Sequence, residues 1–473
     1  MKIYELYISN FRKFTKARFR FNAQSNVTVL IGDNATGKSA ILNSLSIMIS
    51  SYLLDFKVPG AVRHIRKDEV HLKQVVHDGV ASLEPQWSEG VALSCIGSLH
   101  ELYQGDDSTF RNAISWSREL TSEASKTTRI NAKLITGAGK NARMAVEQGE
   151  GVLLPVLAYY GTGRLWHSKK DIPLAEPDSR AIGYRDCLDP ASNHNLFLKW
   201  FSRLELASIQ KRKKYGVLEA VREAVRQCIP QCSNIYFDFE FNQLMTEFED
   251  GRLLGFDNLS DGYRNMLAIV ADISHRAARL NPHLGSDAAV NTPGIVLIDE
   301  IDLHLHPKWQ RIIVNNLREA FPKVQFIVST HSPFIIQSLK AGEVIDLNAT
   351  SHLAVEGQLP QAGCLVDYDA EQPAEPSPAK GFSERSIEDI VEDVMGIGLP
   401  SRSARLERMY KVAEKYYELL DQGSKASGEE KEKLKAELDQ LSAPFSENVA
   451  YHAFLERKRI KAGILSQEEK ETQ

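Results

Sequence analysis

The chain has 473 residues, of which 43% are hydrophobic and 25% are charged, so it is long enough to bury a large core. Its formal net charge of -5 at pH 7 excludes a general electrostatic attraction to nucleic acid, and any such contact would need local basic patches. The five scattered cysteines predict reduced thiols, and the polar start and the lack of a long apolar run predict a cytoplasmic protein without membrane spans.

The first fifty residues predict a strand, a glycine-rich loop and a helix, after two earlier strands over 2–9 and 17–21. A β-branched run over 26–31 precedes Gly32-Asp33-Asn34-Ala35-Thr36-Gly37-Lys38-Ser39, and apolar residues with helical spacing follow it. Loops of this kind bind phosphates through backbone amides and the helix N-terminus.

The glycine-rich loop therefore predicts a nucleotide site. Lys38 would reach the terminal phosphates, and Ser39 would offer its hydroxyl to magnesium. The other candidate phosphate-binding residues are Gly32, Asn34, Gly37 and Ala40.

The remainder of the chain divides by composition and periodicity into four regions. Residues 51–151 predict an inserted lobe, with short strands around 80–96 and a helical stretch over 109–147. Residues 152–350 predict the rest of the core, with a helical lobe over 193–229 and a hairpin over 235–256 whose turn is at 249–251. Residues 351–380 predict a linker, and residues 381–473 predict a charged helical tail for association with a partner or with itself.

Two apolar runs, over 294–298 and 324–329, predict buried parallel strands joined by a helix over 307–321. Asp299 ends the first run, where a carboxylate is costly unless it helps to hold a cation such as magnesium. Glu300 follows it and is placed to polarise an attacking water. His331 follows the second run, near the expected terminal phosphate.

Together with Leu259-Ser260-Asp261-Gly262-Tyr263, these motifs resemble the ATP-binding-cassette (ABC) ATPases, in the soluble branch of chromosome-maintenance and overcoming-lysogenisation-defect (OLD) proteins. The resemblance implies an α/β fold with an ABC-type P-loop ATPase head, and ATP and Mg2+ as cofactors. It also implies a head-to-tail homo-oligomer in which Ser260 and Gly262 act on the nucleotide of another subunit. Asp302 would lie at that junction, and Arg12 of the opening motif would lie near the nucleotide base.

The architecture is similar to that of the ATPase subunits of Septu-type anti-phage systems, because no nuclease domain of the OLD type is recognisable after the head. That resemblance implies an ATPase that regulates a separate nuclease of the His-Asn-His (HNH) class. DNA, or the reverse transcriptase and multicopy single-stranded DNA of a retron, are further candidate partners. The candidate DNA contacts are the cluster Lys211-Arg212-Lys213-Lys214 and the basic residues between 12 and 20.

Several alternatives stay open at this point. A DNA-repair or chromosome ATPase would need long coiled-coil arms, and no uninterrupted heptad stretch is long enough for them. A transporter ATPase usually has a short, well-formed glutamine loop, whereas here Gln86 and Gln148 are both candidates. His304 and His306 favour a structural role over a metal site.

Overall fold

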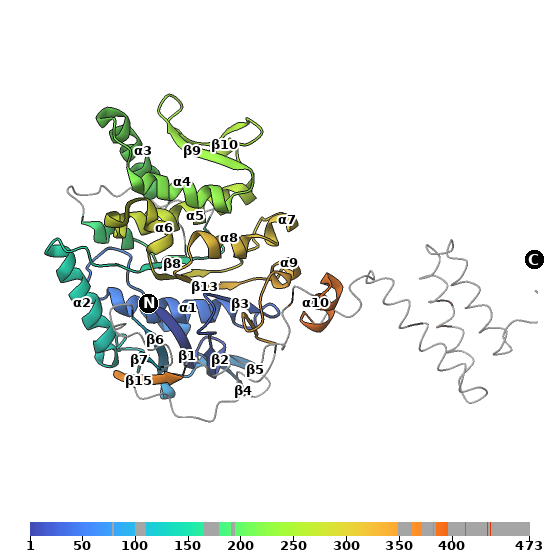
Figure 1. Cartoon of the computed structure of the whole chain (residues 1–473). Coiled ribbons are helices and arrows are strands. Elements are labelled where there is room, and N and C mark those ends of the chain that lie inside the picture. The colour runs from blue at the N-terminus through green and yellow to red at the C-terminus, as the bar shows by residue number, and fades with distance from the viewer. Residues whose placement is uncertain are drawn as a thin grey trace, which may run out of the picture. The chain divides into compact units, whose positions relative to one another are not determined.

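The computed structural model describes residues 1–77, 80–99, 110–164, 179–190, 194–348, 362–369 and 385–395, and the single residues 382, 412, 433 and 436. The chain divides into two compact units, Met1–Ile387 and Glu388–Gln473. The first unit contains two large sheets with their covering helices (Figure 1). None of the helices in the described part of the chain combines the length and apolar character needed to cross a bilayer.

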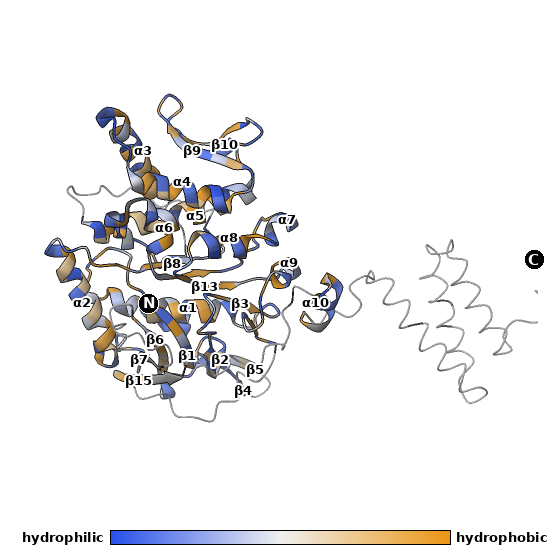
Figure 2. Ribbon diagram, viewed as in Figure 1, coloured by the Kyte–Doolittle hydropathy of each residue, from blue (hydrophilic) through white to orange (hydrophobic). Residues whose placement is uncertain are grey.

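A five-stranded parallel sheet forms the centre of the first unit. Its strand order is β14 (Val344–Asp346), β3 (Val27–Ile31), β13 (Val324–Ser329), β12 (Gly294–Ile298) and β8 (Val156–Tyr160). Every residue of β3, β8, β12 and β13 is buried, as expected for parallel strands covered on both faces, and these strands are among the most hydrophobic in Figure 2. The predicted α/β class and the two predicted parallel strands are confirmed.

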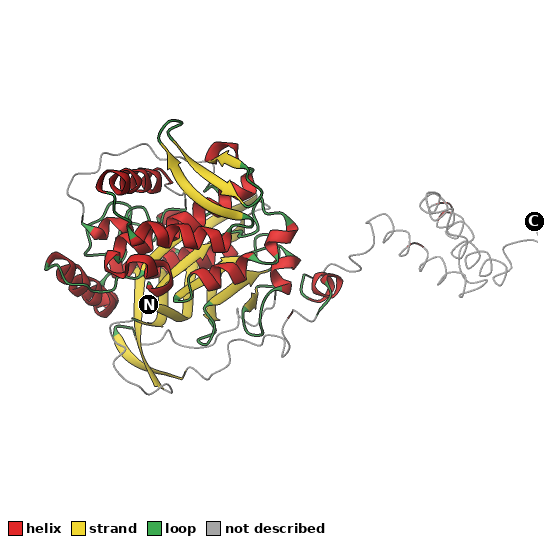
Figure 3. Cartoon of the chain, turned by 45° about the horizontal axis from the view of Figure 1, so that its top comes forward, coloured by secondary structure: helices red, strands yellow, loops and turns green. Residues whose placement is uncertain are grey.

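Helices cover both faces of this sheet (Figures 1 and 3). Helix α1 (Lys38–Ile49) lies on one face, and α5 (Asp261–Leu280) and α8 (Ile313–Ala320) lie on the other. The helical prediction over 193–229 is confirmed by α3 (His194–Lys211) and α4 (Gly216–Cys228). The remaining helices of this unit are α2 (Lys133–Glu147), α6 (Ala288–Asn291), α7 (Pro307–Gln310) and α9 (Pro333–Gln337).

An antiparallel sheet packs beside α1 and has the order β15–β7–β6–β1–β2. Its strands are β1 (Lys2–Phe11), β2 (Phe14–Arg20), β6 (Val91–Ser98), β7 (Phe110–Leu120) and β15 (Cys364–Asp369). Strands β6 and β7 belong to the predicted inserted lobe, yet they continue the sheet that β1 begins. Strand β15 lies within the predicted linker and pairs with β7.

The helical prediction over 109–147 is wrong for its first third, because residues 110–120 form β7. The indole Nε1 of Trp116 in this strand donates to Met48 O at 3.1 Å and anchors the strand against α1. Pairing with β6 over residues 114–120 and with β15 over residues 110–115 overrides the local helical preference. The second part of the same prediction is confirmed by α2.

Two smaller sheets complete the first unit. Strands β4 (Leu72–His77) and β5 (Val80–Pro85) form a hairpin. Strands β9 (Cys232–Asp238), β10 (Gln243–Phe248) and β11 (Leu253–Gly255) form a three-stranded sheet in which the predicted turn at 249–251 joins β10 to β11. In the second unit the structure describes α10 (Ile387–Asp393), while most of the predicted tail and the proline-rich linker over 371–378 lie outside the described residues.

Candidate functional site

The glycine-rich loop joins β3 to α1 at the carboxyl edge of the parallel sheet. Gly37 has a φ of +107°, and a Cβ at this position would lie 2.5 Å from the ring of Phe14, so only glycine fits. The Lys38 Nζ donates to the carbonyls of Gly32 and Asp33 at 2.7 and 2.9 Å, which folds the lysine back across the loop. The ammonium group therefore lies where the loop would hold the phosphates of a nucleotide.

The charges around Lys38 show that separate motifs converge on this loop. Burial lowers the pKa of Lys38, and the carboxylates of Asp299, Glu300, Asp33 and Asp302 oppose that effect. Three of these acids follow β12, two strands away from β3 in the sheet. The sheet thus brings the lysine and the predicted acids into one site, because parallel strands end at the same edge.

Asp299 and Glu300 are fixed by one hydroxyl at the end of the neighbouring strand. The Ser329 Oγ donates to Asp299 Oδ1 at 2.5 Å and accepts the Glu300 amide at 2.8 Å. Glu300 has a φ of +49°, a left-handed conformation that is uncommon for a residue other than glycine. Its half-buried carboxylate is consequently held directly beyond the strand end.

The segment after β13 also contacts residues 299–302, which we call the acidic turn. Thr330 Oγ1 donates to Asp302 Oδ1 at 2.6 Å. The acidic turn is therefore bonded both to Ser329, the last residue of β13, and to Thr330, which follows it. His331 comes next and is half-buried. These positions agree with a site built from the ends of β3, β12 and β13.

The residues present fit a magnesium ion. Asp299 is buried, yet within the described residues its carboxylate has no ion pair and is bonded only to the Ser329 hydroxyl. Ser39 lies exposed at the start of α1. Carboxylate and hydroxyl oxygens, together with phosphates, are the ligands that magnesium prefers in nucleotide sites.

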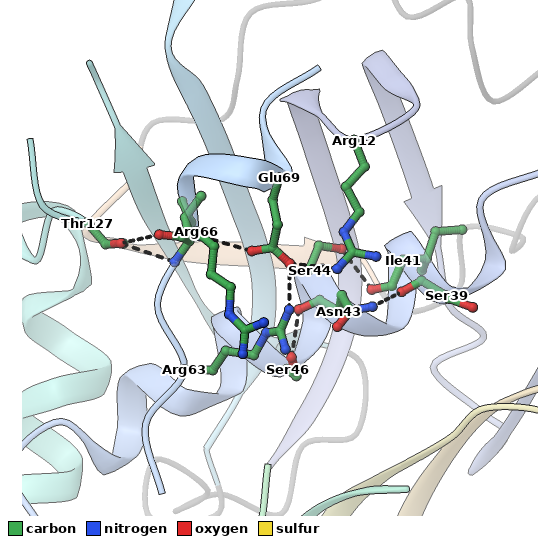
Figure 4. Close-up of polar contacts among 11 residues, drawn as sticks. Arg12, Ser39, Ile41, Asn43, Ser44, Ser46, Arg63, Arg66, Glu69 and Thr127 are labelled. Carbon is green, nitrogen blue, oxygen red and sulfur yellow. Dashed lines mark hydrogen bonds and ion pairs between the residues drawn. The ribbon is translucent and has the colours of Figure 1, made fainter. Parts of the chain in front are cut away.

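The opening motif of the chain contacts the phosphate loop and the buried Glu69, and Figure 4 shows Arg12 and Arg63 around the Glu69 carboxylate. The Lys13 Nζ donates to Ala35 O at 3.0 Å within the loop. Arg12 and Arg63 both donate to the buried carboxylate of Glu69, at 2.8 and 2.5 Å. The Arg12 side chain remains 36% exposed, so it can contact a ligand while Glu69 holds it in place.

The signature segment, Leu259-Ser260-Asp261-Gly262-Tyr263, lies at the start of helix α5. Ser260 is exposed at the N-terminus of α5, and a Cβ on the buried Gly262 would lie 2.7 Å from His304 O. In the part of the chain that is described, no hydrogen bond connects Ser260 or Gly262 with the phosphate loop. The fold therefore places this segment beside residues 303–305 and not beside Lys38.

Sequence reasoning gave no role to Arg164. Its guanidinium is 2% exposed and donates to the carbonyls of Gly161, Asp299 and Glu300 and to Asn265 Oδ1, at 2.6 to 2.9 Å. An arginine in the loop after a buried apolar strand, following Gly161-Thr162-Gly163, was the signal that could have found it. Arg164 links the acidic turn to helix α5.

The structure does not single out either Gln86 or Gln148 as the residue of a glutamine loop. Gln86 donates to Glu84 O beside the β4–β5 hairpin, and Gln148 caps the end of α2. Of the two candidate histidines, His306 has a structural role as the cap of α7, because its Nδ1 accepts the Lys308 amide at 3.2 Å. Across the described ranges, no group of three or more His, Cys, Asp or Glu side chains is placed to hold a metal.

The two basic clusters differ in how far they are neutralised. Arg18 and Arg20 both pair with the buried Glu5, at 2.9 and 3.3 Å, and Arg12 pairs with Glu69. The cluster at 211–214 is exposed, and Lys213 lies over the ring of Tyr215 at 5.8 Å. Only the second cluster keeps most of its positive charge open to solvent.

Among curated proteins, the chain is similar to "Retron Vc95 probable ATPase" of Vibrio cholerae, at 25% identity over 74% of each chain. It is also similar to "Septu protein PtuA" of Bacillus thuringiensis, at 31% identity over 30% of this chain and 32% of that protein. A solved structure with a resembling fold is the SMC head domain from Thermotoga maritima, with a TM-score of 0.38 and 15% identity over 73% of this chain and 94% of that one.

Two protein families match directly. Residues 1–134, which include the phosphate loop, match the family described as "AAA ATPase domain". Residues 100–337, about half of the chain, match the family described as "AAA domain, putative AbiEii toxin, Type IV TA system". With the phosphate loop and the acidic turn in one site, the chain belongs to this AAA domain family and is an ATPase.

Proposed function

We propose that this ATPase is the nucleotide-driven subunit of an anti-phage defence complex, in which head-to-tail association of its copies regulates a separate nuclease of the HNH class. The observation that carries the ATPase part is the convergence of Lys38 with Asp299 and Glu300. The defence context rests on the similarity to proteins named for retron and Septu systems.

In the proposed site, the amides of the loop bind the phosphate chain, and Lys38 neutralises the terminal phosphates. The phosphate-binding residues are Gly32, Asn34, Gly37, Lys38, Ser39 and Ala40. Ser39 and Asp299 would hold Mg2+, which supplies charge stabilisation on the phosphates. Glu300 would polarise the attacking water, and His331 would lie near the terminal phosphate. The half-exposed guanidinium of Arg12, held by Glu69, would contact the nucleotide base.

The proposed association follows from the position of the signature segment. Ser260 and Gly262 belong to the site only if another copy presents them to the nucleotide, because in their own chain they lie beside residues 303–305. The exposed hydroxyl of Ser260 makes no capping hydrogen bond at the start of α5, so it could bind a phosphate oxygen of the nucleotide held by a second copy. Asp302, on the acidic turn, would lie near the same junction.

The partner test is co-expression of the chain with its neighbouring genes, followed by native mass measurement with and without ATP and magnesium. We expect a complex of at least two ATPase copies with a small nuclease, and loss of the nuclease when residues after Lys380 are deleted while nucleotide binding persists. A lone nucleotide-dependent dimer would favour a repair-type ATPase, and a membrane companion would favour a transporter; either would overturn the defence proposal.

Direct contact with nucleic acid is a separate part of the proposal. The exposed cluster at 211–214 is the better candidate, because the first cluster is largely paired with Glu5 and Glu69. Changing its four basic residues to Glu should abolish salt-dependent retention on DNA or RNA. Retention that is equal in the parent and the variant would exclude this surface.

A further inference from the structure

Arg164 donates several hydrogen bonds at the carboxyl edge of the parallel sheet. Its Nη1 donates to Asp299 O at 2.7 Å and its Nη2 donates to Glu300 O at 2.9 Å. Its Nε donates to Asn265 Oδ1 at 2.6 Å. One planar guanidinium therefore holds the backbone of both predicted acids and a side chain of α5.

Asn265 extends this contact towards the subunit junction. It is fully buried on the second turn of α5, and its Nδ2 donates to Leu303 O at 2.8 Å. Helix α5 starts at the signature segment, and Leu303 follows Asp302 on the acidic turn. A continuous chain of hydrogen bonds thus joins Glu300, Arg164, Asn265 and Leu303.

We propose that Arg164 is a positioning residue for ATP hydrolysis, which fixes the backbone of Glu300 and, through Asn265, makes the acidic turn and the signature segment move as one rigid unit. The proposal rests on the proposed roles of Glu300 and Ser260. When a second copy closes over the signature segment, the link would transmit that event to the water-polarising carboxylate in the same chain. The two sites of a head-to-tail pair would then be coupled.

The backbone conformation of Glu300 explains why the hydrogen bond from Arg164 is needed. Its φ of +49° is unfavourable for a non-glycine residue and persists only when surrounding contacts hold it. Among the described residues, three contacts hold its backbone: the Ser329 Oγ at its amide, and the Arg164 Nη2 and the Leu303 amide at its carbonyl. Only the Arg164 contact ties that carbonyl to a side chain from another strand–loop segment, and without it the carboxylate could relax away from the position that orients water.

The charge of Arg164 is compatible with this role. Burial lowers the pKa of Arg164 to about 10, while the carboxylates of Asp299, Glu300 and Asp302 oppose that effect. The guanidinium therefore stays protonated at neutral pH. A positive charge at this position also adds to the field that favours ionised acids on the turn.

Arg180 is a matched control for a purely structural arginine. It likewise donates to three backbone carbonyls, those of Val152, Leu280 and Glu150, but it does not contact the acidic turn. Lysine at either position keeps the charge and loses the planar fork of donors. Because Arg164 is buried and Arg180 is half-buried, the thermal midpoint of each variant shows how much packing is lost at each position.

The test compares Arg164→Lys with Arg180→Lys in the full-length chain. Measurements are the thermal midpoint, the ATP dissociation constant, kcat and KM for ATP, and ATP-induced pairing by native mass. For Arg164→Lys we expect kcat to fall ~30-fold with the dissociation constant within ~2-fold, since misplacing a catalytic group by about an ångström is enough for such a loss. For Arg180→Lys we expect an unchanged kcat.

Equal kcat values for the two lysine variants would overturn the proposal. If Arg164→Lys does not fold, Asn265→Asp decides, because it keeps the acceptor for Arg164 and removes the donor to Leu303 O. A lower kcat with unchanged ATP binding supports the link, and a parental kcat refutes it. Lys38→Ala and Glu300→Gln are run in parallel: if they leave hydrolysis intact, the proposed site itself is wrong, whereas if they abolish it, only the role of Arg164 is in question.

Discussion

The phosphate half of the candidate site, residues 32–39 with Asp299 and Glu300, is built differently from the signature half, residues 260–262. The phosphate half is assembled by strands of one sheet, whose ends meet at a common edge. The signature half is a helix start that lies against residues 303–305. A single chain therefore assembles the phosphate half by itself. In the proposed pair, its signature half would instead close over the nucleotide of another copy.

This comparison makes a general prediction about mutations. Changes in the phosphate half should affect nucleotide binding in a single copy of the chain, whereas changes in the signature half should affect ATP turnover only when copies associate. Four substitutions test the difference, in order of decreasing expected effect.

Glu300→Gln should reduce kcat by ~1000-fold, a loss typical of removing a group that activates the attacking water. Nucleotide binding should persist, because Lys38 and the loop are untouched, and the closed pair should accumulate in native mass measurements. Glu319→Gln, an exposed glutamate on α8, is the control. Hydrolysis at the parental rate would show that Glu300 is not the water-polarising group.

Lys38→Ala should weaken ATP binding by ~100-fold, because a charge-assisted bond to phosphate contributes about 1.5–3 kcal/mol. The effect should appear in the isolated chain by calorimetric titration with a non-hydrolysable ATP analogue. Lys308→Ala, an exposed lysine on α7, should bind like the parent. An affinity equal to that of this control would remove Lys38 from the site.

Ser260→Ala should leave the ATP affinity of a single copy unchanged and reduce ATP-dependent pairing and kcat by ~10-fold, the value of about one hydrogen bond. Its hydroxyl makes no capping bond in its own chain, so stability should not change. Pairing and kcat are compared over a range of protein concentrations. Weakened binding in the single copy would mean that Ser260 acts on its own nucleotide.

Gly262→Ala should have the smallest effect, a destabilisation of about 1 kcal/mol. Alanine favours a helix by about 1 kcal/mol over glycine, but here its Cβ would meet His304 O at 2.7 Å, and a backbone carbonyl cannot easily move away. The thermal midpoint, measured without nucleotide, should fall by roughly 2–4 °C. A raised midpoint would show that α5 is not seated tightly on residues 303–305.

The local motifs were predictable because each follows a short-range rule. The glycine loop, the apolar runs at 294–298 and 324–329 and the acids after them are set by steric and burial requirements that the sequence states directly. The helical prediction overlooked such a rule at 110–120, where Ile114, Trp116 and Leu120 alternate with polar residues in the period of a strand. Which strands it pairs with, β6 and β15, was decided only by the tertiary structure.

Arg164 shows that prediction from the sequence has the same limit within the candidate site. Nothing in the residues around it indicates that its partners are Asn265, 101 positions later, and the carbonyls of Asp299 and Glu300. Hydrogen bonds to backbone carbonyls leave no pattern in the identity of the accepting residues. Contacts of this kind emerge only when the strands and helices are placed beside each other.

The sequence by itself determined the candidate phosphate-binding residues, since glycines, a lysine and acids at strand ends follow from local geometry and charge. The tertiary structure alone decided which of them meet. Sheet order brings Lys38 and the acidic turn together, and α5 places Gly262 against His304 O, because strand pairing and helix packing join segments that are distant along the chain.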